Sequence, residues 1–166
     1  FVQAELASLH QTHGRESLPC VCLRYASRLN SGVRGQLRVL ERVEFWIDFI
    51  CANSQFPASE RLRVQFGVAT LSDFCNCGCN SFAVAVPADV VIEPIARPGT
   101  PGGMIFESAF KLFPTGKSLE ILLFSDTNGN LSYVEIDCNG NSEPVPDTIQ
   151  INGPPYHVYA SSAVAR

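Results

Sequence analysis

The clearest hydrophobic pattern of the chain lies between Gly35 and Asn53. Apolar residues recur there at steps of three and four, the period of one face of an α-helix. The positions that share this face are Leu37, Leu40, Val43, Ile47 and Ile50, and Phe45, Trp46 and Phe49 widen it. Asn53 and Pro57 then act as helix-ending signals. The pattern predicts a deeply buried amphipathic helix of about 17 residues that packs against a flat surface.

The next segment, PASERLRVQF at 57–66, fits two periods. Its composition and the proline at its start favour a helix. Leu62, Val64 and Phe66 also alternate with polar residues, as they would in a strand. We expect a short helix to about Gln65, followed by a strand that begins near Val68.

From there onward, the pattern is that of β-strands. The candidate strands are VATLSDF, NSFAVAV, DVVIEPI, MIFESAFKLF, SLEILLFS and NLSYVEID, and YHVYAS could add an edge strand. Asn128-Gly129 lies between SLEILLFS and NLSYVEID, and this pair is typical of a type I′ hairpin turn. Helices that precede an antiparallel sheet of about five strands predict an α+β fold.

The same pattern divides the chain into three parts. Residues 1–33 carry no clean period and form a poorly patterned N-terminal extension. Residues 34–148 make a single α+β domain, and residues 149–166 form a tail with the candidate edge strand. A chain of 166 residues is long enough to bury the core of one domain without disulfides or metals.

Charge and composition narrow the classes of function. The net charge of −4 argues against a general nucleic-acid or membrane-surface binder, because both need a basic face. A run of arginines at Arg24, Arg28, Arg34, Arg38 and Arg42 is interpreted as the solvated face of a helix. No apolar run is long enough to span a bilayer, and the first thirty residues lack the pattern of a secretory signal. Seven cysteines in close pairs indicate a reducing compartment, so we expect a cytoplasmic protein.

Three of those cysteines occupy alternate positions in DFCNCGCNSFAVAV, at residues 73–86. The thiolates of Cys75, Cys77 and Cys79 could hold a zinc ion, with Cys138 or Cys51 as a fourth ligand. The C-x2-C spacing of structural zinc sites is absent from the chain, however. A redox dithiol would need C-x-x-C at the start of a helix, whereas a strand follows here.

A packing role suits the same cysteines. Cysteine is small and is among the most buried residue types. A strand that lies beneath Trp46 or Phe49 would need such small neighbours, and Gly78 would permit a bulge. We favour this interpretation, and metal binding by Cys75, Cys77, Cys79 and Cys138 is the alternative.

The order of these segments resembles that of a family of small, uncharacterised bacterial proteins. In that family a CxCGC segment precedes a strand, and a G-x-L-S-x-L-E-I strand follows later. The matching pieces are Leu62 to Gln65, Cys75 to Cys79, Ile121 to Phe124 and Leu131 to Ile136, with Val134 where the family pattern has leucine. The family has no established activity, cofactor or catalytic residues. The resemblance therefore implies the α+β fold and no chemistry.

Other motifs of known chemistry are incomplete. PTGKS, at residues 114–118, lacks the earlier glycine and the following helix of a phosphate-binding loop. DTNGN, at residues 126–130, lacks the sixth-position glycine of a calcium loop, so both segments are predicted to be turns. His10 and His13 share a helical spacing but have no carboxylates beside them. No catalytic residue can be nominated.

The sequence leaves three functions open. We expect a small intracellular, non-enzymatic interaction or accessory domain whose sheet edge or helix face meets a protein partner or a second copy. The first alternative is a protein stabilised by zinc at the cysteine cluster. The second alternative is a small ligand-binding or hydrolytic module, which would need a pocket.

Overall fold

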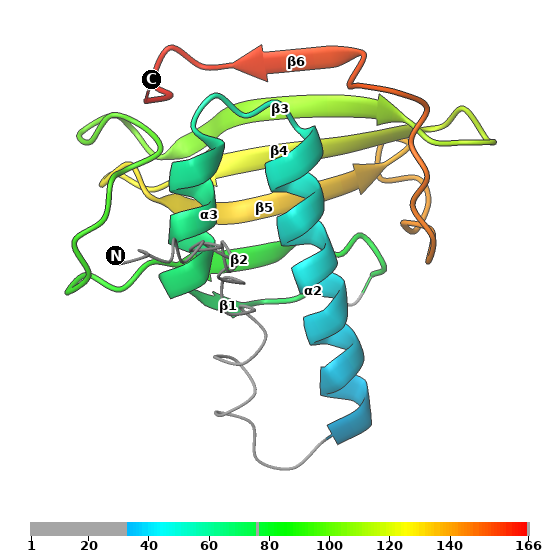
Figure 1. The fold of residues 1–166 in the computed structure, drawn as a ribbon, viewed down its shortest axis with the longest axis horizontal. Helices are drawn as coiled ribbons and strands as arrows, with labels where there is room; N and C mark the ends of the chain where they lie inside the picture. The colour runs from blue at the N-terminus through cyan, green and yellow to red at the C-terminus, as the bar shows by residue number, and fades with distance from the viewer. Residues whose placement is uncertain (1–32, 76, 166) are drawn as a thin grey trace, which may run out of the picture.

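The computed structural model describes residues 33–75 and 77–165. Two helices, α2 (Val33–Asn53) and α3 (Ser59–Val68), pack side by side on one face of an antiparallel sheet (Figure 1). The predicted α+β fold, with helices before the sheet, is confirmed. Most of the predicted N-terminal extension, with Cys20, Cys22, His10 and His13, lies outside the described residues.

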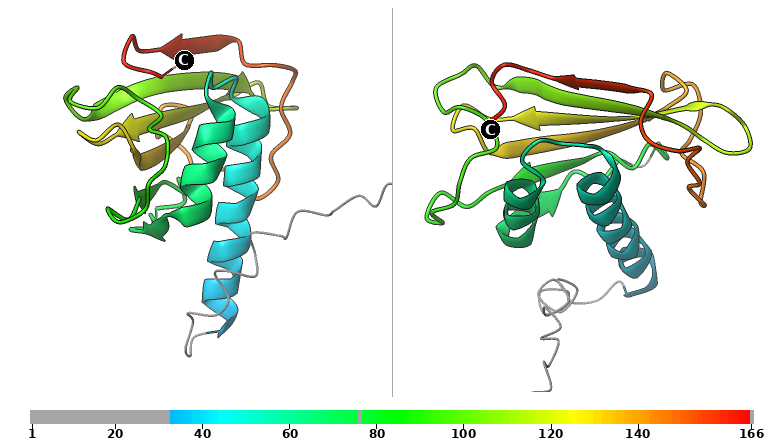
Figure 2. Two further views of the ribbon diagram at one scale, coloured as in Figure 1. Left: turned by 60° about the vertical axis from the view of Figure 1, so that its left-hand side comes forward. Right: turned by 45° about the horizontal axis from the view of Figure 1, so that its top comes forward.

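The sheet has six strands in the order β1-β2-β5-β4-β3-β6, one more than expected. The strands are β1 (Thr70–Ser72), β2 (Phe82–Ala85), β3 (Gly103–Lys111), β4 (Ser118–Ser125), β5 (Leu131–Cys138) and β6 (His157–Ala160). The sixth strand is the edge strand suggested by YHVYAS, and it pairs with β3. Figure 2 shows both helices on the same side of the sheet, with the first turns of α2 extending past β1.

The core lies between the helices and the sheet. The apolar stripe of α2 supplies the fully buried Trp46 and Ile50, as its period predicts. Phe49 meets Phe110 of β3 edge to face, with 5.3 Å between ring centroids. Aromatic pairs of this geometry stabilise a core beyond the area that they bury. Phe45 is an exception to the predicted stripe, because 43% of its surface stays exposed.

A buried glutamine joins α3 to the hairpin loop. The Gln65 side chain is fully buried and donates from Nε2 to the Glu93 carbonyl and the Asn130 side chain. Its Oε1 accepts a hydrogen bond of 2.7 Å from the Leu131 N–H. The amide therefore satisfies backbone groups that would otherwise be buried without partners.

The β4–β5 hairpin is confirmed, but its predicted turn type is wrong. A type I′ turn needs positive φ at both central residues. Only Gly129 adopts it in this loop, with φ of +80°, and the Gly129 N–H donates to the Asp126 carbonyl. Both Asn128 N–H and Asn130 N–H donate to the Asp126 carboxylate at 2.9 Å. The loop is thus a longer turn with one left-handed glycine.

One predicted strand is absent. DVVIEPI, at residues 89–95, forms no strand in the part of the chain that the structure describes, and Val91 is fully exposed. This segment instead turns inward to bury Ile95 and to form an isolated bridge between Ala96 and Val164. The segment PTGKS is a turn between β3 and β4, as predicted. None of the described helices combines the length and the apolar character needed to cross a membrane.

Candidate metal centre

The three alternating cysteines lie in the loop between β1 and β2. Cys77 is exposed, and Cys75 and Cys79 are half-buried. The loop turns tightly because three of its residues, Asp73, Gly78 and Asn80, have positive φ. Aspartate, glycine and asparagine are the residues that tolerate this region best. The cysteines are therefore folded into a turn and do not follow one face of a strand.

This turn gathers the sulfur atoms. The Sγ atoms of Cys75, Cys77 and Cys79 all lie within 4.8 Å of one another. The sulfur atoms of Cys75 and Cys77 are 2.7 Å apart, and both thiols are free. Among the His, Cys, Asp and Glu side chains of the described residues, these three are the group that is placed to share a metal ion.

Ser81 anchors the loop to the sheet. The Cys75 N–H donates to the Ser81 carbonyl at 2.9 Å, which closes the loop on itself. The buried Ser81 hydroxyl accepts from the Ile136 N–H of β5 at 3.0 Å and from the Cys79 thiol at 3.2 Å. The Ser81 hydroxyl thus connects the Cys79 thiol to β5 in the central part of the sheet and fixes the position of Cys79.

A second contact holds the loop from the other side. The Gly78 carbonyl accepts from the Val145 N–H at 3.0 Å. A Cβ atom at position 78 would lie only 2.9 Å from the Pro144 Cβ, and Gly78 has φ of +93°. Glycine is therefore required there for both conformation and close approach. The bulge suggested for Gly78 is instead a turn packed on Pro144.

Hydrogen bonding shifts the pKa values of Cys75 and Cys77 in opposite directions. The pKa of Cys77 is lowered because the Cys75 and Cys79 side chains and the Cys79 N–H form hydrogen bonds to its sulfur. The same contact with Cys77 raises the pKa of Cys75 to about 11. Cys77, the exposed thiol of the cluster, therefore deprotonates more readily than Cys75, and thiolate is the form that binds metals.

The fourth predicted ligand is not brought to the cluster. Cys138 ends β5 and is only 2% exposed, and it does not belong to the group of three cysteines that could hold a metal ion. Burial raises the pKa of the Cys138 thiol, and the nearby Glu143 carboxylate raises it further. Cys51, the other candidate, is half-buried on α2, and burial raises its pKa to about 11.

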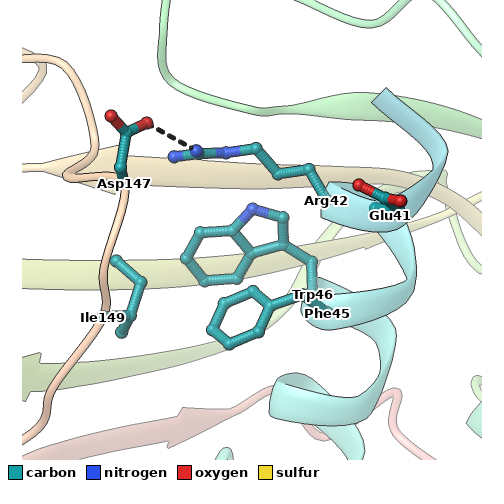
Figure 3. Close-up of a pocket in the computed structure, with 6 residues that line it drawn as sticks. All are labelled: Glu41, Arg42, Phe45, Trp46, Asp147 and Ile149. Carbon is teal, nitrogen blue, oxygen red and sulfur yellow. Dashed lines mark hydrogen bonds and ion pairs between the residues drawn. The ribbon is translucent and has the colours of Figure 1, made fainter. Parts of the chain in front are cut away.

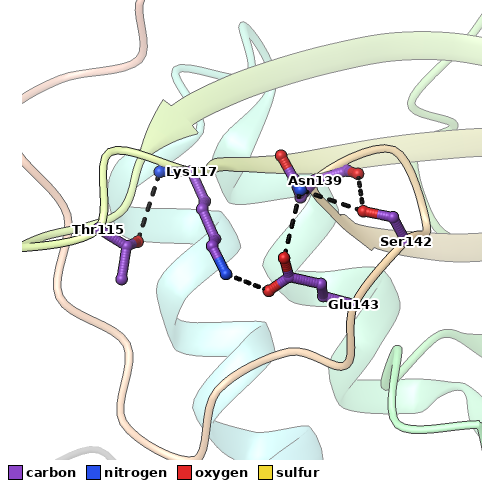
Figure 4. Close-up of polar contacts among 5 residues, drawn as sticks. All are labelled: Thr115, Lys117, Asn139, Ser142 and Glu143. Atoms are coloured by element: carbon purple, nitrogen blue, oxygen red, sulfur yellow. Dashed lines mark hydrogen bonds and ion pairs between the residues drawn. The ribbon is translucent and has the colours of Figure 1, made fainter.

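The loop that follows Cys138 is closed by polar contacts (Figure 4). The Lys117 ammonium forms an ion pair with Glu143, and the Asn139 side chain donates to the Ser142 hydroxyl at 3.0 Å. The Ser142 hydroxyl returns a hydrogen bond to the Asn139 carbonyl. These contacts hold the 139–143 loop, which leads to the Pro144 and Val145 contacts with the cysteine loop.

The packing interpretation is wrong for the clustered cysteines. None of the three belongs to the buried core beneath Trp46 or Phe49, and Cys77 faces solvent. Cys138, in contrast, is buried in the core. Sequence reasoning missed Ser81 and Pro144, because the contact of Ser81 with Ile136 and that of Pro144 with Gly78 join residues distant in the chain. Positive-φ residue types flanking the CxCGC segment were the local signal available.

Comparison of the chain with protein-family models, with curated proteins and with solved structures finds no match. The resemblance to bacterial proteins with a CxCGC segment stays a prediction that depends on its own short motifs.

Proposed function

We propose that this protein binds a thiophilic metal ion, zinc in the first instance, through Cys75, Cys77 and Cys79. The observation that carries the proposal is the approach of three free sulfurs to within 4.8 Å on an anchored loop. Thiolates are the ligands that zinc prefers in closed sulfur sites. The lowered pKa of Cys77 supports the proposal, since a metal ion competes with fewer protons there.

The spacing of the sulfurs is close to that of a zinc site. With zinc–sulfur bonds of about 2.3 Å, tetrahedral ligands lie roughly 3.8 Å apart. The Cys75 and Cys77 sulfurs are 2.7 Å apart, and all three sulfurs lie within 4.8 Å of one another. The sulfur–sulfur separation of a tetrahedral zinc site lies between these two values. Loading a metal would then need the Cys75 and Cys77 sulfurs to separate by about 1 Å, which side-chain rotation can supply.

Three protein ligands leave one coordination position open. In zinc proteins, three protein ligands with an open fourth position distinguish exchangeable or reactive sites from closed structural ones. Because Cys77 is exposed, the fourth position would face solvent and could take water or an external ligand. We therefore propose a metal-binding accessory protein with an accessible ion.

Cobalt substitution tests this proposal. Titration of the reduced protein with Co²⁺ should produce thiolate-to-metal charge-transfer absorption that saturates at one equivalent. Cys77→Ser should reduce that absorption and weaken binding, whereas Cys51→Ala, which removes a thiol outside the cluster, should leave the spectrum unchanged. Equal spectra for Cys77→Ser and the parent protein would refute the proposal.

A second candidate is a protein partner at the sheet edge, favoured by the exposure of β6. All four residues of this strand are exposed, including Val158 and Tyr159, and β6 pairs on one side only. Free strand edges are templates for pairing with another chain. We propose that β6 of a second copy of the chain pairs with this edge. The parent protein should then sediment as a dimer at high concentration, and the Val158→Lys variant should sediment as a monomer. Sedimentation of the parent protein as a monomer at every concentration would exclude this pairing.

A further inference from the structure

A pocket opens on the side of α2 that faces the segment after β5. Its volume is about 360 Å³, within the range of small-molecule sites. The lining residues are Glu41, Arg42, Phe45 and Trp46 of α2 with Asp147 and Ile149 of the opposite segment (Figure 3). Figure 3 shows the Arg42 and Trp46 side chains extending from the helix toward Asp147 and Ile149.

Two N–H donors at this pocket have no acceptor. The Trp46 indole Nε1 and the Arg42 Nε are both buried without a hydrogen-bond partner among the residues that the structure describes. Trp46 as a whole is 0% exposed. Buried donors are nearly always paired, and unpaired ones are explained by function or by an absent partner group. The two unpaired donors indicate a ligand that supplies an acceptor oxygen.

The Arg42 guanidinium already binds the Asp147 carboxylate, and a carboxylate of a ligand can replace it. Its Nη1 donates to Asp147 at 3.0 Å, and its Nη2 donates to the Val145 and Pro146 carbonyls. The Asp147 side chain is fully exposed, so solvent screens this ion pair and makes it weak. The backbone contacts, in contrast, keep the guanidinium at the pocket when Asp147 leaves.

We infer that this pocket binds a small monocarboxylate with an apolar body. Its carboxylate takes the place of Asp147 on Arg42 and accepts from the unpaired N–H groups, while Phe45 and Ile149 contact the apolar part. Phe45 is 43% exposed, an unusual position for a large aromatic side chain on an otherwise buried stripe. The lining carries two carboxylates, Glu41 and Asp147, and one guanidinium, so its net charge is negative and disfavours phosphates and other multiply charged anions more than a monocarboxylate.

The structure revises what the pattern predicts for both polar groups. The predicted solvated face is wrong for Arg42, because this residue is half-buried and bonded across to residues 145–147. The predicted apolar stripe is right for the ring of Trp46 and does not account for its N–H. Their spacing of four residues, which places them on one helix face, is the signal that connects them.

The single tryptophan of the chain provides the assay. The full chain is titrated with 3-phenylpropionate while Trp46 fluorescence is excited at the red edge of its absorption, where the ligand is transparent. The acid should produce a saturable change, and the neutral 3-phenylpropionamide should bind at least about tenfold more weakly, because it lacks the charge-assisted hydrogen bonds. No saturable change with the acid, or equal binding of acid and amide, would overturn the inference.

Two variants separate the inferred roles. Arg42→Gln should weaken binding of the acid by about tenfold or more. Asp147→Asn should tighten it, because it removes the competing carboxylate without changing size. Urea unfolding of each variant, followed by circular dichroism, checks that the fold persists. Because Asp147 is fully exposed, this variant keeps the test valid if Arg42→Gln unfolds. Unchanged or weaker binding by Asp147→Asn would contradict the inference.

Discussion

Gly129 at the β4–β5 hairpin offers a quantitative test of the fold. Its carbonyl accepts hydrogen bonds from the Ile95 and Ala96 N–H groups, at 2.9 and 3.0 Å, so the hairpin loop fastens the segment before β3. Its φ is +80°. A Cβ at this position would overlap the Ala96 carbonyl oxygen and lie 2.9 Å from the Ala96 carbonyl carbon. The substitution Gly129→Ala therefore meets two separate penalties.

The first penalty is conformational, and the second is steric. A non-glycine residue in the left-handed region costs roughly 1 kcal/mol. The overlap is with backbone, so the 94–96 segment must shift and lose one or both of its hydrogen bonds, at about 1 kcal/mol each. We expect Gly129→Ala to lower the free energy of unfolding by about 2–3 kcal/mol, and Gly129→Val by more, because β-branching adds to the conformational penalty.

Gly116→Ala is the matched control. Gly116 has a similar φ of +70°, but a Cβ there would meet nothing within 4 Å. Only the conformational penalty of roughly 1 kcal/mol should remain. Urea unfolding of both variants, followed by circular dichroism and Trp46 fluorescence, gives the two losses of stability. If they agree within about 0.5 kcal/mol, the close approach of Gly129 to Ala96 is not present in solution.

Three further predictions concern buried polar groups and thiols. Gln65→Leu leaves the Leu131 N–H and the Glu93 carbonyl without their hydrogen-bond partner. The free energy of unfolding measured by urea titration should therefore fall by about 2–4 kcal/mol. A loss below about 0.5 kcal/mol would argue against the buried amide contacts. Cys138→Ser places a hydroxyl in the core and should lower the melting temperature without changing the metal stoichiometry; loss of metal in this variant would return Cys138 to the ligand set. Because its pKa is lowered, Cys77 should be alkylated by iodoacetamide at pH 7 faster than Cys51, whose pKa is about 11. Raising the pH should reduce the difference between the two alkylation rates, because Cys51 then deprotonates. Peptide mapping by mass spectrometry measures both rates, and faster labelling of Cys51 at pH 7 would contradict the hydrogen-bonding pattern of the cluster.

The main elements of the fold could be predicted because each follows from a local period. The stripe on α2 buries Trp46 and Ile50, and the alternation of β4 and β5 sets their inner faces. Local pattern does not show whether a strand finds a partner. Residues 89–95 are rich in the β-branched residues of a strand, yet they belong to none of the six strands of the described sheet and form a loop that buries Ile95.

The candidate site was predicted in its residues and not in its arrangement. The spacing of Cys75, Cys77 and Cys79 suggested both a shared metal and a packed strand face. The deciding contacts join the loop to β5 through Ser81 and to the 144–145 segment through Gly78. Such contacts connect residues more than fifty positions apart, so hydrophobic period and motif spacing carry no information about them.

The zinc content of the protein tests the central claim most directly. Full-length chain purified under reducing conditions and without chelator is analysed for metals, and its melting temperature is measured with and without a strong chelator. A metal bound by Cys75, Cys77 and Cys79 predicts about one zinc per chain, a lower melting temperature after chelation, and loss of both properties in Cys77→Ser. Substoichiometric zinc, together with a melting temperature that the chelator does not change, would contradict the proposed metal centre.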